Sequence, residues 1–144
     1  MKFADLLHVF KQGSGTVRSH MKNLIEMAAV DGHFHENEKD LLKKIAKRNG
    51  ISESQLEEIQ RNPKDVVFEI PKDDKEKFHQ LYDLVHMMSI DNQVHVEEQN
   101  LCKLFAIKFG YKRDMAGELV ETVRQNIKNG INHDEAMKRV KMML

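Results

Sequence analysis

One stretch of this chain occurs twice, and the duplication constrains the fold more than any other sequence feature. Residues 24–50 align with residues 84–110 at a constant offset of 60 and without a gap. Helical packing explains why apolar residues match, but it does not require Asp, His and Glu to recur in the same turn. The duplicated turn is therefore where function should be sought. The matched pairs are Leu24 with Leu84, Met27 with Met87, Asp31 with Asp91, His35 with His95, Glu38 with Glu98, Leu41 with Leu101, Lys43 with Lys103, Ala46 with Ala106 and Gly50 with Gly110.

Apolar residues recur at three- and four-residue spacing along almost the whole chain, which holds only two prolines and seven glycines. This spacing is typical of amphipathic helices, and no segment has a clear strand pattern. We therefore expect an all-α fold of seven to eight helices, forming a single domain over residues 1–144. Its internal repeats, residues 21–52 and 81–112, should form two helical hairpins related by an approximate twofold axis.

Glycines, prolines and capping residues predict where the helices begin and end. Gly13-Ser14-Gly15 should end a short first helix, and a second should run from about Thr16 to Val30. Gly50, Gly110 and Gly130 suit the left-handed position after a helix. We expect a helix over residues 36–49 and a short one of about ten residues between Ser52 and Pro63. A long helix should begin at Asp73-Asp74, and the helix after it should end at Gly110. The last two should cover residues 112–128 and begin at the capping residue Asn132, respectively.

Between the two repeats lies the least regular part of the chain, residues 62–71. Pro63 and Pro71 flank the run Val66-Val67-Phe68-Glu69-Ile70. Proline cannot donate a backbone hydrogen bond, and it restricts the residue before it to extended conformations. We therefore expect an extended connector that packs its apolar side chains on the helices, with an edge strand as the alternative.

The overall composition excludes several classes of partner. The 23 basic and 23 acidic residues cancel, so the net charge gives no reason to expect nucleic acid or an anionic membrane. The chain contains no run of about 18 apolar residues, so we expect no integral membrane segment and a cytoplasmic protein whose partners are other proteins.

Cys102 is the only cysteine and aligns with Leu42, which indicates a small buried side chain. A basic cluster of Lys43, Lys44, Lys47 and Arg48 is expected to be a solvated helix end.

Each copy of the duplicated turn begins with an aspartate followed by a residue that tolerates positive φ. These are Asp31-Gly32 in the first copy and Asp91-Asn92 in the second. Each Asp should lie at the end of the incoming helix, where the helix dipole disfavours an anion. Some other interaction should therefore stabilise it.

The second half of each turn predicts the start of the next helix. His35 and His95 fall at the expected cap position, with Glu38 and Glu98 three residues later. At that position a carboxylate can accept a hydrogen bond from a free backbone N–H, and the helix dipole stabilises its charge. Both glutamates therefore have a structural role available to them.

Two explanations for the repeated aspartates stay open. One is a hydrogen bond from backbone N–H groups at the start of the next helix, as is common in tight turns. The other is a divalent cation, because under a twofold axis the four carboxylates would converge and repel one another unless protonated or metal-bound. Oxygen ligands suit calcium or magnesium, whereas imidazole would favour zinc. The candidate metal ligands are Asp31, Glu38, Asp91 and Glu98, with His35 and His95 as additional ligands.

Residues 27–38 read Met-Ala-Ala-Val-Asp-Gly-His-Phe-His-Glu-Asn-Glu, followed by Leu41-Leu42, Ile45-Ala46 and Gly50-Ile51-Ser52. This pattern resembles the signature of TerB-like domains, which are all-helical bacterial modules named from a tellurite-resistance protein and also found in some membrane-associated J-domain co-chaperones. By the resemblance, Asp31, Gly32 and Glu38 occupy the motif positions of the first copy, and Asp91 and Glu98 those of the second. His35 and His95 depart from the family, which usually has a small hydroxyl cap there, and Asn92 replaces the second Gly.

The resemblance implies a scaffold or sensor in stress responses, with an acidic metal site in some members and no catalytic activity. The sequence itself contains no nucleophile elbow, zinc-protease motif or phosphate loop, so we expect no enzyme and assign no catalytic residue. The leading hypothesis is a non-enzymatic interaction scaffold with a divalent-cation site at the turns. The alternatives are a purely structural interaction domain without metal and a metal-dependent enzyme.

Overall fold

The computed structural model describes residues 3–29, 35–90 and 95–143, with side chains from residue 15 onward. Within these ranges the chain forms seven α-helices, two short 3₁₀ turns and no strand, which confirms the predicted all-α fold. None of the described helices is long and apolar enough to cross a membrane. The helices are α1 (Phe3–Ala29), α2 (Glu36–Arg48), α3 (Glu53–Arg61), α4 (Asp74–Ser89), α5 (Val96–Lys108), α6 (Ala116–Lys128) and α7 (His133–Lys141), with 3₁₀ turns at Pro63–Asp65 and Arg113–Met115.

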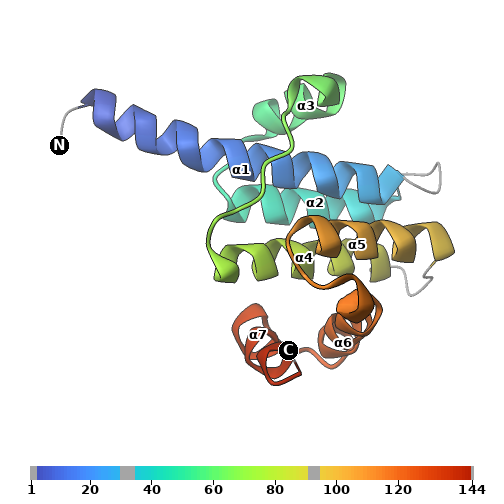
Figure 1. Ribbon diagram of the computed structural model, residues 1–144. Helices are drawn as coiled ribbons and strands as arrows, with labels where there is room; N and C mark the ends of the chain where they lie inside the picture. The colour runs from blue at the N-terminus through green and yellow to red at the C-terminus, as the bar shows by residue number, and fades with distance from the viewer. Residues whose placement is uncertain (1–2, 30–34, 91–94, 144) are drawn as a thin grey trace.

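Two helical hairpins form the centre of the molecule. The α1–α2 hairpin and the α4–α5 hairpin pack together mainly through α1 and α4. In Figure 1 one hairpin lies above the other, and their helices run in about the same direction across the view. Helix α2 also contacts α4, and α5 contacts α1, as an approximate twofold relation between the hairpins requires. The surroundings of the two hairpins differ, because α3 packs on α1 and α2, whereas α6 and α7 pack on α4.

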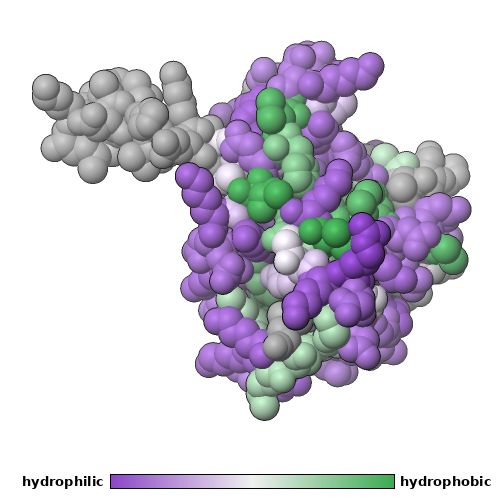
Figure 2. All heavy atoms as spheres, viewed as in Figure 1, coloured by the Kyte–Doolittle hydropathy of each residue, from purple (hydrophilic) through white to green (hydrophobic). Residues whose placement is uncertain are grey.

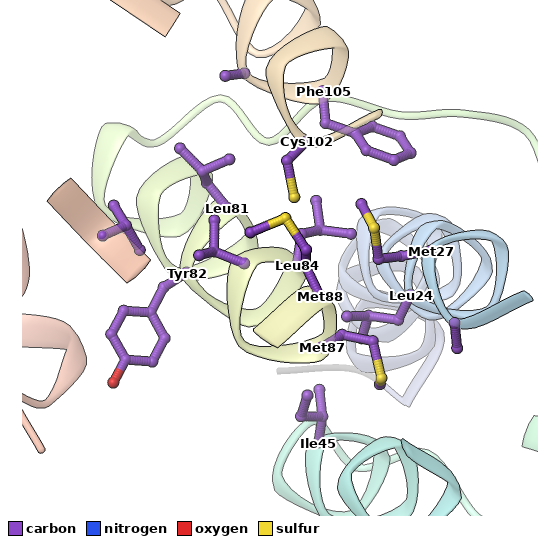
Figure 3. Close-up of a cluster of buried hydrophobic side chains, with 14 of the residues drawn as sticks. Leu24, Met27, Ile45, Leu81, Tyr82, Leu84, Met87, Met88, Cys102 and Phe105 are labelled. Carbon is purple, nitrogen blue, oxygen red and sulfur yellow. The ribbon is translucent and has the colours of Figure 1, made fainter. Parts of the chain in front are cut away.

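The repeated apolar residues form the core between the hairpins. Leu24 and Leu84 are fully buried, as are Met27 and Met87 (Figure 3). Cys102 is also fully buried, with its sulfur directed into this core, which confirms its predicted environment. Burial raises the pKa of the Cys102 thiol and so disfavours the reactive thiolate. Each hairpin therefore contributes the same positions to a shared apolar interior.

The predicted break at residues 13–15 is wrong, because α1 continues without interruption from Phe3 to Ala29. A glycine inside a helix costs only about 1 kcal/mol relative to alanine, so it does not end a helix that other interactions favour. Gly15 instead leaves space for a neighbouring side chain. A Cβ added there would lie 2.7 Å from Oε2 of Glu69, in the connector.

The other helix-ending signals are confirmed. Gly50, Gly110 and Gly130 have φ angles of 75°, 103° and 73°, in the left-handed region that glycine adopts without strain. Ser52 accepts a hydrogen bond from the backbone N–H of Gln55, whose side chain accepts one from the Ser52 N–H. These residues therefore set helix ends as the sequence predicts, although a 3₁₀ turn replaces the expected first turn of the helix over residues 112–128.

Candidate functional site

The structure describes only part of the predicted acidic site. Asp31 and Asp91 lie outside the described residues. Glu38 and Glu98 occupy the same position in the first turns of α2 and α5, and only 5% and 6% of their respective surfaces are exposed. Whether the carboxylates of the two turns converge therefore stays a prediction.

Glu38 has the structural role that the sequence suggests. The Glu38 carboxylate accepts a hydrogen bond from the backbone N–H of His35 at 3.2 Å. In the second copy, Nε2 of His95 lies 4.0 Å from Oε1 of Glu98. Gln55 makes the corresponding capping bond in α3 while remaining exposed, so capping does not require burial. The burial of both glutamates thus exceeds what the cap needs.

Both histidines of the predicted site precede their helices and are exposed to solvent. Within residues 3–29, 35–90 and 95–143, no three or more His, Cys, Asp or Glu side chains are grouped as a metal site would need. Because the two aspartates are outside these ranges, this finding concerns only the remaining four predicted ligands.

A second cluster, which the sequence analysis did not predict, surrounds Asp83 in α4. Only 3% of the Asp83 side chain is exposed, and side chains from three other helices contact its carboxylate. Nε2 of His20, in α1, lies 2.8 Å from Oδ2, and Nε2 of His133, in α7, lies 3.0 Å from Oδ1. Arg48, at the end of α2, donates to Oδ2 at 2.5 Å. We call these four residues the Asp83 cluster.

The surroundings of Asp83 keep its carboxylate ionised. Burial by itself raises the pKa of Asp83, but the hydrogen bonds from His133 and His20 and the charge of Arg48 outweigh it and hold the pKa well below its ordinary value. A carboxylate only accepts hydrogen bonds, so both imidazoles must carry a proton on Nε2. The Nδ1 atom of His20 has no hydrogen-bond partner in the described part of the chain.

Aromatic contacts extend the cluster around α7. The rings of Tyr82 and His133 lie 4.0 Å apart, and the rings of His79 and His133 lie 4.9 Å apart. The Tyr82 hydroxyl donates to the carbonyl of Ile131, just before α7, at 2.6 Å. Nε2 of His79 lies 3.4 Å from Oδ1 of Asp134. These contacts join the start of α7 to α4.

The sequence contained two signals for this cluster. Asp83 lies between Tyr82 and Leu84 in the long helix predicted from Asp73-Asp74, and a carboxylate that such a helix buries needs a partner. Arg48 belongs to the basic cluster that was predicted to be solvated. That prediction is confirmed for the lysines Lys43, Lys44 and Lys47, which are exposed. Arg48 is exposed as well, with 49% of its side chain accessible, but the prediction missed that the last turn of α2 directs its guanidinium to the Asp83 carboxylate. No local pattern relates His20 or His133 to Asp83, since 63 and 50 residues separate them from it.

The geometry of the Asp83 cluster favours a structural role. Its carboxylate is buried and is already contacted by three side chains, so it has little access to a substrate. The cluster instead connects α1, α2, α4 and α7 through one buried charge. The carboxylates at the duplicated turns are therefore the stronger candidates for binding a ligand.

Comparison with known proteins yields no match, whether to protein-family models, curated proteins or solved structures. The likeness to TerB-like domains therefore depends on the sequence pattern described above alone.

Proposed function

We propose that this chain is a non-enzymatic, TerB-like stress-response module of the cytoplasm that acts as a protein-interaction scaffold. In this proposal the two turns share one divalent cation, which stabilises the scaffold. The resemblance of residues 27–52 to TerB-like domains supports the family assignment. The proposed ligands are Asp31, Glu38, Asp91 and Glu98, with His35 and His95 as additional ligands.

The main observation in favour of the cation site is that Glu38 and Glu98 are buried to the same extent. Removing a carboxylate from water costs free energy unless other groups compensate for the lost hydration. The hydrogen bond from His35 compensates for this cost at Glu38, and a cation held together with Asp31 and Asp91 would add to the stabilisation of both carboxylates. Two glutamates at equivalent positions with the same burial are what a shared site between the repeats requires.

Thermal unfolding with added cations tests the proposal. A cation that binds only the folded protein stabilises it by about 2.7 kcal/mol at a hundred times its dissociation constant. We expect calcium, magnesium, manganese or zinc to raise the melting temperature above that in a chelator. The double substitution Asp31→Asn and Asp91→Asn should abolish the rise, whereas Asp114→Asn, at an exposed position in the 3₁₀ turn after α5, should leave it unchanged.

The histidines distinguish the classes of metal. If His35 and His95 are ligands, replacing both with alanine should weaken the effect of zinc more than that of calcium or magnesium. Absence of any metal-dependent rise in the unsubstituted protein would favour the second candidate, a purely structural interaction domain. The capping bond between Glu38 and His35 already supports that candidate.

A further inference from the structure

One histidine of α4 lies where its charge can affect the packing of helices. Hydrophilic side chains cover most of the face of the molecule that Figure 2 shows. Charges on such a surface are solvated and screened, so protonating a side chain there changes stability little. His35 and His95 are exposed in this way, whereas His86 is partly buried where α4 meets α6. A proton on His86 therefore has a larger effect on its surroundings.

His86 lines a cavity of about 530 Å³ between the ends of α4 and α6. Its ring also meets the ring of Tyr82 edge-on, with the centroids 6.3 Å apart. Both helices contribute side chains to the cavity, which is lined by His86, Ser89 and Ile90 on one side and by Arg124, Ile127 and Lys128 on the other. The α6 side of the cavity thus brings two cationic side chains to the same space as the imidazole.

The other charged groups near His86 are mostly cationic. Burial is the main cause that lowers the pKa of His86, and the charges of His133, Arg48 and Lys44 lower it further. These three side chains come from α7 and α2, so two more helices oppose a positive charge at this position. His86 is therefore held in its neutral form more strongly than an exposed histidine.

The nearby carboxylates are engaged with other partners. Asp83 lies one turn before His86 and favours its protonation, but three side chains already contact the Asp83 carboxylate. On α6, Glu121 accepts hydrogen bonds from Arg124 and Gln125. Among the described residues, no carboxylate forms an ion pair with the His86 ring. A charged His86 would therefore lack a carboxylate of its own.

The first repeat has no equivalent of this arrangement. At the offset of 60, His86 corresponds to Glu26, which is exposed. Helix α3 ends at Arg61, which corresponds to position 121, whereas α6 continues to Lys128. The part of α6 that lines the cavity therefore has no counterpart in α3. The histidine occurs in the repeat where a helix lies over this position.

We propose that His86 makes the contact between α4 and α6 sensitive to pH, so that mild acid loosens the last turns of α6. A protonated imidazole would face Arg124 and Lys128 across the cavity, and like charges repel one another. This regulatory role goes beyond the scaffold function proposed above. It does not depend on a cation at the duplicated turns.

The lowered pKa determines the sign of the effect. The unfolded chain takes up a proton at His86 near pH 6.5, whereas the folded protein takes it up only at lower pH. The stabilisation from neutral His86 is therefore complete above about pH 6.5 and is lost as the pH falls through the folded value. The ordinary pKa of an aspartate is about 3.9, so measurements between pH 7.5 and pH 5.5 avoid the titration of Asp83.

Thermal unfolding at pH 7.5 and pH 5.5 tests the proposal. His86→Gln keeps a polar side chain that does not titrate, and its melting temperature should fall at least about 2 °C less than that of the unsubstituted protein. The matched control is His79→Gln, at another histidine of α4 whose Nε2 lies 3.4 Å from the Asp134 carboxylate. This control should leave the acid-induced fall undiminished. The same fall in His86→Gln and the unsubstituted protein would overturn the proposal.

A substitution on the opposite side of the cavity tests the repulsion without changing His86. Lys128→Glu replaces an exposed cation of α6 with a carboxylate. It should also reduce the fall in melting temperature between pH 7.5 and pH 5.5, because a protonated His86 would then face an opposite charge. This variant keeps the proposal testable if His86→Gln does not fold. An unchanged fall in Lys128→Glu would contradict repulsion across the cavity.

Two measurements on the unsubstituted protein locate the effect. In an NMR titration, the His86 ring should change protonation below pH 6.5, and a midpoint at or above that value would refute the proposal. Backbone amide exchange, corrected for its intrinsic pH dependence, should increase at pH 5.5 mainly over residues 122–128 of α6. This local increase should be absent in His86→Gln. Exchange in α6 that does not respond to pH would also overturn the proposal.

Discussion

The two repeats bury different polar residues at the same position, and the comparison shows what duplication conserves. Asn23 in α1 and Asp83 in α4 are equivalent at the offset of 60, and both are almost fully buried. Asp83 is contacted by three side chains, whereas Nδ2 of Asn23 has no hydrogen-bond partner among the described residues. The repeats thus share their packing positions but not their polar interactions.

The difference follows from what covers each hairpin. Helix α7 packs on α4 and brings His133 to Asp83, while α1 has α3 beside it instead. The residues one turn earlier differ in the same way. His20 contacts Asp83, but its counterpart Gln80 donates only to the carbonyl of Thr16 at 3.4 Å, and its Oε1 has no partner in the described ranges. Of the three partners of Asp83, His133 comes from a helix outside both hairpins, whereas His20 and Arg48 come from the first hairpin.

Asp83→Asn makes the two repeats alike and should have the largest effect. Removing one partner of a buried ion pair typically costs about 3–5 kcal/mol, and the lower end applies here because 49% of the Arg48 side chain is exposed and water can solvate its charge. We expect a loss of this order in the free energy of unfolding, measured with urea. Asp114→Asn, which changes an exposed carboxylate, is the control and should change it by less than about 0.5 kcal/mol. Equal stability of the two variants would show that the Asp83 cluster contributes little.

The pH dependence of this effect has a defined sign. The pKa of Asp83 is lowered in the folded protein, so the unfolded chain binds more protons in acid and folding is favoured at higher pH. The stabilisation is complete above the ordinary Asp pKa of about 3.9 and is lost as the pH falls through the folded value. The stability difference between the unsubstituted protein and Asp83→Asn should therefore be similar at pH 7 and pH 5 and smaller at pH 3. If this stability difference changed only between pH 6 and pH 8, its pH dependence would come from the imidazoles instead of the carboxylate.

The reciprocal substitution, Asn23→Asp, places a carboxylate in the repeat that lacks the cationic partners. A buried charge without compensation is destabilising, and we expect a loss of about 2–3 kcal/mol at pH 7. Burial without such partners raises the pKa of an introduced carboxyl, so this loss should shrink as the pH falls and the group becomes neutral. Urea unfolding at pH 7 and pH 4.5 measures both effects. A variant as stable as the parent at pH 7 would mean that a hydrogen-bond donor or a positively charged side chain reaches this position too.

Local rules predicted the parts of the fold that local residues determine. The apolar spacing, the three glycines with positive φ and the Ser52–Gln55 cap each act within a few residues, and each is confirmed. The continuation of α1 through Gly13 and Gly15 was missed, because helix-breaking propensity amounts to only about 1 kcal/mol per residue.

The Asp83 cluster could not be predicted in the same way. Its members come from four helices, and nothing in the sequence near Asp83 indicates that His133 or His20 approaches it. For the duplicated turns, the sequence correctly predicted the capping role of Glu38. This bond joins residues only three positions apart, so local spacing is enough to predict it. Whether the carboxylates of the two turns meet depends on tertiary packing, which residue spacing does not specify.

A smaller effect is expected where the cluster meets α7. Tyr82→Phe removes the hydroxyl that donates to the carbonyl of Ile131 and keeps the ring beside His133. One such hydrogen bond contributes about 0.5–1.5 kcal/mol, and we expect a loss within that range. In hydrogen-exchange measurements, the rate of backbone amide exchange should increase mainly at the start of α7. An increase spread evenly over α1 and α2 would mean that the hydroxyl stabilises the whole molecule.

The smallest effect should come from Asn23→Leu, which gives the sharpest contrast between the repeats. Replacing a buried polar group that has an unpartnered donor by an apolar group of similar size removes a desolvation cost, so the free energy of unfolding should change by less than about 1 kcal/mol in either direction. Asp83→Leu, at the equivalent position, should instead destabilise the protein as strongly as Asp83→Asn, because it leaves Arg48 and two imidazoles without their carboxylate. Urea unfolding of both leucine variants measures the contrast directly. If Asn23→Leu lowered the free energy of unfolding as much as Asp83→Leu, the Asn23 side chain would make a polar interaction that stabilises the fold. The two positions would then have different partners but contribute equally to stability.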